Sequence, residues 1–333
     1  MLPRKRSRSS GHTTALIAAV VCVVAAFLLF INRQYVVDQL SIWQYQPSSV
    51  VASFVERAGM SDSGKFYFYA SQPAVETAIE FNKKCGREEE RTAILGCYNG
   101  RNIYIYNVTD QRIDGIREVT AAHEMLHAAY DRLDEEEIKK VDTLLEVEYA
   151  KLKSDKKLAE RMAFYERTEP GQRNNELHSM IGTEIADISP ELESYYKKYF
   201  ADRSKVVTLH ATYAGVFNDL QSRSQELTRQ LTDLNKSIEQ ASVRYNNAVS
   251  QLNKDINSFN DKANNGGFTN NSEFQAERER LVTRADRLDA DRQAIDDDVN
   301  RYETLRQELA GIASQSEALN QSIDSSLAPA PSL

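Results

Sequence analysis

Two stretches near the C-terminus repeat apolar residues every seven positions, and this feature restricts the fold more than any other. Steps of four and three alternate in the first run, which comprises Leu227, Leu231, Leu234, Ile238, Ala241, Tyr245, Ala248 and Leu252. The second run comprises Leu281, Leu288, Ile295, Val299, Tyr302, Leu309, Ile312, Leu319 and Ile323. Such spacing places one apolar seam along each helix, and a seam of this kind pairs with another helix.

The segment NNGGFTNNS at residues 264–272 separates the two runs and cannot continue a helix. Two arms of similar length with one break between them predict an antiparallel coiled-coil hairpin over residues 204–326. Separate arms of a parallel oligomer are the alternative. Either form offers a surface for a protein partner or for self-association. Residues 327–333, LAPAPSL, are expected to form a disordered tail.

The N-terminus has the pattern of a membrane anchor. Residues 1–12 carry four Lys or Arg side chains and no acidic one, and residues 13–31 carry no charge. At about 1.5 Å per residue, an apolar helix of this length spans a bilayer. The positive-inside rule then predicts a single-pass protein of the cell membrane, with residues 1–12 in the cytoplasm and the rest extracytoplasmic. A cleaved signal peptide is the alternative, although no small-residue cleavage site closes the apolar run.

Charge and cysteine content narrow the class of protein further. The formal net charge is −8, and this argues against a nucleic-acid binder, which needs a basic face. Cys85 and Cys97 lie in the segment expected outside the membrane, where two cysteines at this spacing favour a disulfide. Two free thiols are the alternative.

Between the anchor and the coiled coil, the sequence predicts a linker and one folded domain. Residues 32–64 are expected to form a membrane-proximal helix or linker, interrupted at Pro47. Residues 65–203 are expected to form an α+β domain, with strands first and helices from Asp114 to about Phe200.

Three stretches of the domain have strand character. KFYFYAS at residues 65–71 is aromatic and alternating, and TAILGCY and RNIYIYNV lie on either side of Asn99-Gly100. Asn-Gly between two such runs is a strong hairpin signal. The sequence therefore predicts a small antiparallel sheet.

The stretch EVTAAHEMLHAAYDRL, residues 118–133, carries the candidate chemistry. On a helix, His123 and His127 point the same way one turn apart, which suits two ligands of one zinc ion. Glu124 lies beside the first histidine, where a carboxylate serves as general base toward a zinc-bound water. The alternative is a solvated helix that carries two surface histidines.

Zinc in a catalytic site needs a third protein ligand, and a later helix offers one. Within QRNNELHSMIGTEIADI, residues 172–188, the stretch NNELHSMIGTE resembles the third-ligand helix of the gluzincin peptidases, the thermolysin-like group. The resemblance implies a zincin-like metallopeptidase domain with one zinc ion and Glu176 as the third ligand. Glu184 and His178 are the alternative ligands. An ordinary polar helix would have the same composition.

The resemblance covers short motifs within roughly residues 100–190, and one departure from it matters. Gluzincins carry an aspartate one turn after the ligand glutamate, and that position here is Met180. Asp187 is a candidate substitute, which fits Glu184 as ligand better than Glu176. In zincins an edge strand lies above the metal helix and pairs with the extended substrate, and NIYIYNV is expected to fill this place.

These features together predict a membrane-anchored, extracytoplasmic zinc endopeptidase that hydrolyses protein or peptide substrates. Either Tyr165 or His178 is expected to stabilise the oxyanion. The alternative is an envelope scaffold that binds a partner through its coiled coil and carries an inert or metal-stabilised zincin-like domain. A cell-wall amidase with the same zinc chemistry is a third interpretation.

Overall fold

The computed structural model describes residues 10–86, 94–168 and 171–327, and the chain divides into two compact units. The first unit comprises the chain up to Gly215 together with the segment from Asn320 onward, and the second runs from Val216 to Leu319. Most of the expected basic segment and nearly all of the expected tail lie outside the described residues.

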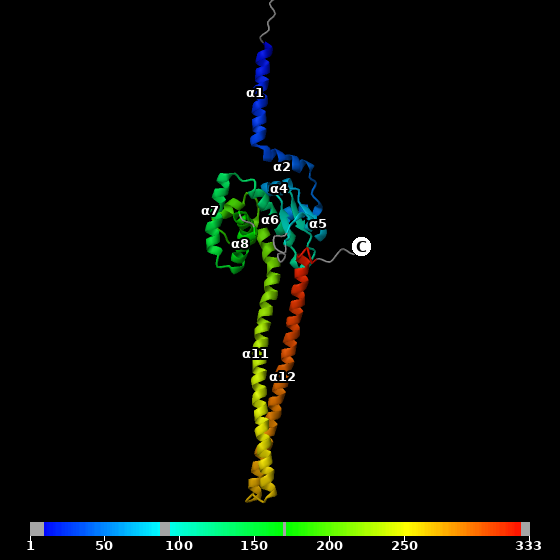
Figure 1. Ribbon diagram of the computed structural model, residues 1–333, viewed down its shortest axis with the longest axis vertical. Coiled ribbons are helices and arrows are strands. Elements are labelled where there is room, and N and C mark those ends of the chain that lie inside the picture. The colour runs from blue at the N-terminus through cyan, green and yellow to red at the C-terminus, as the bar shows by residue number, and fades with distance from the viewer. Residues whose placement is uncertain (1–9, 87–93, 169–170, 328–333) are drawn as a thin grey trace, which may run out of the picture. The chain divides into compact units, whose positions relative to one another are not determined.

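Helices dominate the described chain, and one small sheet lies in the first unit (Figure 1). The elements are α1 (Ser10–Ile31), α2 (Arg33–Gln44), α3 (Ser49–Arg57), α4 (Asp62–Ala70), β1 (Ala74–Glu76), α5 (Ala78–Lys84), β2 (Gly96–Tyr98), β3 (Ile103–Tyr106), the 3-10 turn η1 (Gln111–Ile113), α6 (Ile116–Tyr130), α7 (Glu135–Leu152), α8 (Lys156–Thr168), α9 (Arg173–Glu184), α10 (Pro190–Tyr196), α11 (Arg203–Asn264) and α12 (Asn271–Ile323).

The expected N-terminal apolar helix is present as α1. Its window Thr14–Ile31 is long and apolar enough to cross a membrane, and none of that window is buried. A signal sequence has the same length and composition, so the choice between an anchor and a signal sequence stays a prediction.

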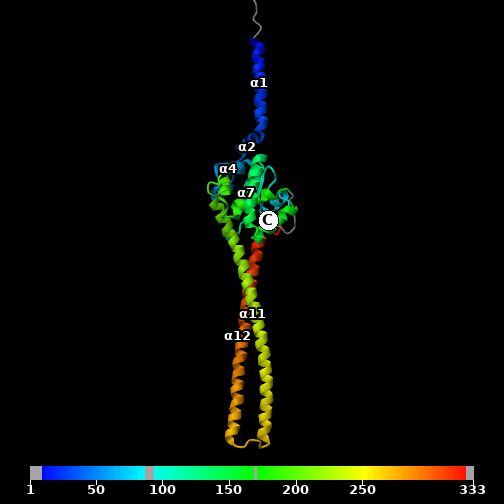
Figure 2. The same cartoon turned by 90° about the vertical axis from the view of Figure 1, so that its left-hand side faces the viewer.

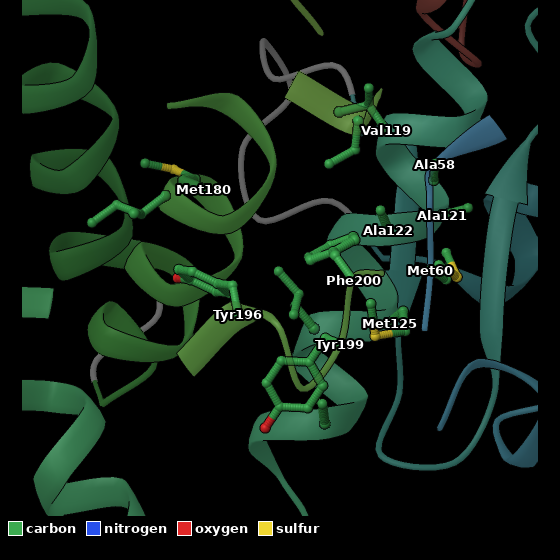
Figure 3. Packing of buried hydrophobic residues seen from close by; sticks show 14 of the residues in the cluster. Ala58, Met60, Val119, Ala121, Ala122, Met125, Met180, Tyr196, Tyr199 and Phe200 are labelled. Atoms are coloured by element: carbon green, nitrogen blue, oxygen red, sulfur yellow. The ribbon is translucent and has the colours of Figure 1, made fainter. Parts of the chain in front are cut away.

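The core of the first unit forms around α6. Ala121, Ala122 and Met125 of this helix are fully buried, and so are the aromatic side chains of Tyr199 and Phe200 that follow α10. Figure 3 shows these side chains grouped together with Met180 of α9. Alanines on α6 allow its neighbours to approach closely, so the helix with the HExxH pattern lies at the centre of the domain.

The sheet is mixed rather than antiparallel, which corrects the sequence prediction. Its strand order is β1-β3-β2, with β1 parallel and β2 antiparallel to β3. The expected hairpin at Asn99-Gly100 is confirmed, because Gly100 has φ +82° and the Asn99 side chain accepts hydrogen bonds from the backbone of Arg101 and Asn102. The parallel strand β1 comes from a segment for which the sequence did not predict a strand.

The expected strand at residues 65–71 is wrong, because residues 65–70 belong to α4 and Ser71 is its C-cap. The hydroxyl of Ser61 caps this helix by accepting a hydrogen bond from the backbone of Gly64. A side chain at Gly64 would collide with the carbonyl oxygen of Tyr199, at 2.2 Å from an added Cβ. Glycine at this position lets α4 dock closely, and that tertiary packing overrides the strand preference of successive aromatic residues.

The second unit is an antiparallel helical hairpin, as the repeats predict. Figures 1 and 2 show α11 and α12 running side by side and joined by one turn. Ion pairs join Arg223 to Glu308 and Asp255 to Arg284, so residue numbers fall along one helix as they rise along the other. Three phenylalanine rings, those of Phe259, Phe268 and Phe274, pack against one another at the turn with centroids 5.1–5.3 Å apart.

Candidate metal centre

Helix α6 carries both histidines of the HExxH pattern. Gly115 is the N-cap of the helix and has φ +96°, a conformation that glycine adopts without strain. His123 and His127 lie one turn apart with ring centroids 4.7 Å from each other. His127 is buried and His123 is half-buried at the edge of a cleft. The solvated-helix alternative is therefore wrong, because nearly every residue of α6 is buried.

Helix α9 brings Glu176 to these histidines. A Cβ at Gly182 would lie 2.5 Å from Leu126 Cδ1 and 2.7 Å from Tyr196 Cε1, so only glycine allows α9 to pack this closely on α6. The Glu176 carboxylate is buried, with Oε1 3.4 Å from His127 Nε2 and Oε2 3.6 Å from His123 Nε2.

Each of these two distances is close to the separation expected between two ligands of one zinc ion, and the two involve different oxygens of Glu176. Two ligand atoms at about 2.0–2.1 Å from zinc, at a tetrahedral angle, lie about 3.4 Å apart. The candidate ligand atoms of His123, His127 and Glu176 all lie within 4.8 Å of one another. This cluster could hold a metal ion, and two imidazoles with one carboxylate are the donor set of catalytic zinc sites.

The surroundings of the cluster also fit a metal. Asn175 Oδ1 lies 2.9 Å from His127 Nδ1, so this ring nitrogen donates to the amide and Nε2 keeps its lone pair for a metal. Asn175 is held in turn, because its amide donates to Gln172 Oε1 at 3.0 Å. Glu176 Oε2 is buried and has no hydrogen-bond partner among the described residues, as expected for an atom that binds a metal.

The charge state of Glu176 suits this role as well. Burial acts to raise the pKa of its carboxyl, but the neighbouring His127 and His123 outweigh burial and lower that pKa below its ordinary value. The carboxylate is therefore ionised at neutral pH and available as a ligand.

Glu124 lies in the same cleft and packs against the edge strand of the sheet. A Cβ at Gly96 of β2 would lie 2.7 Å from Glu124 Oε1 and 2.6 Å from Thr120 Cγ2. The missing side chain at Gly96 therefore leaves the space that the Glu124 carboxylate occupies.

The expected edge strand is also corrected. β3, which lies within the tyrosine-rich NIYIYNV segment, is the central strand, and β2 forms the edge that lines the cleft. A disulfide joins Cys97 of β2 to Cys85 at the end of α5, with Cα atoms 5.9 Å apart. The cross-link ties the edge strand to a helix of the domain.

Glu184, the second candidate ligand, lies apart from the three-residue cluster and has another partner. Its carboxylate accepts two hydrogen bonds from Arg161, at 2.5 and 2.8 Å. Burial favours the protonated form of Glu184, yet the Arg161 guanidinium outweighs this effect and lowers the carboxyl pKa. His210 Nε2 lies 3.5 Å from the same carboxylate.

His178, the third candidate ligand, is completely buried on another side of α9. Its Nε2 shares a hydrogen bond of 3.0 Å with the Tyr195 hydroxyl, and its ring stacks on Tyr196. Burial lowers the pKa of His178 to about 3, so the imidazole is neutral. His178 is not part of the cluster of His123, His127 and Glu176 and does not line the cleft beside it.

The cluster of His123, His127 and Glu176 opens into a cleft of about 540 Å³. Tyr165, the other oxyanion candidate, lines this cleft together with Arg161 of the same helix. Tyr213 of α11 also lines it, and burial raises the pKa of its phenol. The cleft therefore presents hydrogen-bond donors beside the candidate metal ligands and Glu124.

Sequence reasoning missed four features of the site: Asn175, Gly96, Arg161 and Tyr213. Asn175 had a local signal, since it directly precedes the ligand in the quoted motif, whereas the other three reach the cleft only through tertiary packing. Comparisons of the chain with protein-family models, curated proteins and solved structures found no match.

Proposed function

We propose that this protein is a membrane-anchored, extracytoplasmic zinc endopeptidase. One observation carries the proposal: ligand atoms of His123, His127 and Glu176 come from two helices to within 4.8 Å of one another, while Glu124 lines the same cleft. A purely structural zinc site has no use for a carboxylate beside its ligands and closes all four positions with protein groups. Three protein ligands instead leave one position open, as in catalytic sites.

The chemistry follows from the positions of the side chains. A zinc ion held there would lower the pKa of a water ligand to about 7 and polarise a substrate carbonyl. Glu124 accepts the proton of the attacking water and later donates it to the leaving amine. Asn175 keeps the His127 ring oriented through its hydrogen bond to Nδ1.

Stabilisation of the developing oxyanion needs a hydrogen-bond donor in the cleft. Tyr165 is the candidate from sequence, and Tyr213 and Arg161 line the same cleft. The strand β2 borders the site as a sheet edge, and such an edge offers backbone groups to an extended peptide. These features favour a peptide as the substrate.

The test uses the full-length chain and measures zinc and hydrolysis separately. Elemental analysis of purified wild type is expected to find about one zinc per chain, and a peptide library analysed by mass spectrometry is expected to show cleavage. Glu124→Gln is expected to retain zinc and lose hydrolysis, whereas Glu176→Gln is expected to lose both.

Glu184→Gln is the matched control, because it removes a second carboxylate from the same helix, one that is 12% exposed and pairs with Arg161. It is expected to retain zinc. Folded wild type without zinc under metal-replete conditions would refute the enzyme and favour the scaffold alternative. Zinc with equal turnover in wild type and Glu124→Gln would refute the assignment of the base.

A further inference from the structure

Only Asn32 separates the end of α1 from the start of α2, and one face of α2 contacts the domain. Tyr35 stacks on Phe66 of α4 with ring centroids 5.9 Å apart. Asp38 is buried and accepts two hydrogen bonds from Arg132, at 2.9 and 2.8 Å. The docked face of α2 is therefore fixed by specific contacts.

Arg132 connects this docked face to α6, the helix that carries His123 and His127. Its guanidinium also donates to the carbonyl of Ala128, in the last turn of α6, at 2.6 Å, and to the Tyr98 hydroxyl of β2 at 3.2 Å. Ala128 directly follows the candidate ligand His127. One buried side chain thus joins α2, the metal helix and the edge strand.

The opposite face of α2 is apolar and uncovered. Val37, Leu40 and Trp43 follow one another at three-residue steps, so they form one stripe on the helix surface. Their exposed fractions are 53%, 52% and 82%. In the described part of the first unit beyond α1, the other exposed large hydrophobic residues are Tyr35 of α2, which stacks on Phe66, Val50 of α3, Ile79 of α5, Val147 of α7 and Leu327 after α12.

The stripe is suited to lipid rather than to a protein partner. Three side chains offer far less than the ~800 Å² per partner that a stable protein interface buries. A twelve-residue helix is about 18 Å long, so every part of α2 stays near the end of the apolar helix that precedes it. Tryptophan concentrates at membrane interfaces, and Arg33, one turn before Val37, has a side chain that can extend to lipid headgroups.

We propose that the stripe of Val37, Leu40 and Trp43 lies in the headgroup region of the bilayer, with α2 parallel to the membrane surface. Through Asp38 and Arg132, the membrane then holds α6 and β2 in a defined orientation. The inference rests on the membrane anchor of the proposed function and is independent of zinc and catalysis.

Trp43 is the single tryptophan of the chain, so its fluorescence reports on this stripe without labelling. The full-length protein is reconstituted into phosphatidylcholine–phosphatidylglycerol vesicles, and flotation establishes that it is membrane-bound. Lipids brominated near the headgroup then test contact with the bilayer, and iodide on both sides of the membrane tests contact with water. Trp43 is expected to lose at least half of its emission to the brominated lipid and to be protected from iodide.

The control is the double variant Trp43→Phe, Val147→Trp, which moves the probe to an exposed site on α7. Its emission is expected to be quenched by iodide and unaffected by brominated lipid. If Trp43 in membrane-bound protein is quenched by iodide and unaffected by brominated lipid, the inference is overturned. The stripe would then be a surface for a protein partner. Protein that fails to float with the vesicles would overturn the anchor and the inference together, whereas zinc content measured on the same sample reports on the metal site alone.

Discussion

Removal of the Asn175 side chain should weaken zinc binding without removing any ligand. Asn175 Oδ1 accepts from His127 Nδ1 at 2.9 Å, and both residues are buried. Such an outer hydrogen bond fixes the tautomer and the ring orientation of a ligand histidine, and its loss typically costs about 10–100-fold in metal affinity. We therefore expect Asn175→Ala to raise the Kd for zinc by that factor, which is about 1.4–2.8 kcal/mol of binding free energy.

Competition with a chromogenic zinc chelator measures this change directly and needs no substrate. Asn174→Ala is the matched control, since Asn174 is the adjacent residue and its side chain accepts from Arg173 at 2.8 Å. Its zinc affinity should equal that of wild type. Asn175→Asp should restore or tighten binding, because a carboxylate accepts the same hydrogen bond and makes the histidine a stronger ligand.

Equal zinc affinities for wild type and Asn175→Ala, with both proteins folded by circular dichroism, would refute this reasoning. The His127 ring would then be held by its packing in α6 alone. A parallel loss in Asn174→Ala would show instead that the effect comes from disturbance of the start of α9.

Three further predictions concern the surroundings of the site. Gly96→Ala should keep zinc by elemental analysis but lower kcat/KM by about 100-fold, because the new Cβ displaces Glu124 by on the order of 1 Å. Cys97→Ser should lower the free energy of unfolding in urea by about 3 kcal/mol, and a reductant should then destabilise wild type but not the variant. In wild type, the lowered pKa of Glu184 contributes stability above the ordinary carboxyl pKa of 4.5, and this is lost as pH falls through the folded-state value. In Arg161→Met the guanidinium is gone, so burial raises the pKa of Glu184. The Tm of this variant should therefore fall below that of wild type most at neutral pH, and the difference should shrink in acid.

Local patterns in the sequence predicted several elements correctly, and each has a short-range cause. The seven-residue repeats determine the hairpin of α11 and α12, because a seam of this period is buried only against another helix. The HExxH spacing places His123 and His127 on one face of any helix. The turn at Asn99-Gly100 requires a positive φ that glycine adopts readily.

Other features were decided by packing between distant segments. Successive aromatics at residues 65–71 favour a strand locally, yet the Ser61 cap and the close approach at Gly64 make them helical. The sequence alone left Glu176 and Glu184 as rival ligands, because both lie on α9 with similar surroundings in the chain. Which of the two meets the histidines depends on Arg161, which forms an ion pair with Glu184, and on Gly182, which lets α9 pack closely on α6.

By itself the sequence determined the periodicities of this protein: an apolar N-terminal helix, a helix with two histidines on one face, and two arms that pair. The tertiary structure decided which carboxylate meets the histidines, which strand borders the cleft and which amide orients His127. The physical reason is the range of the interactions. A helical face or a turn is set by residues a few positions apart, whereas a metal site needs atoms from segments about fifty residues apart to meet within a few ångströms.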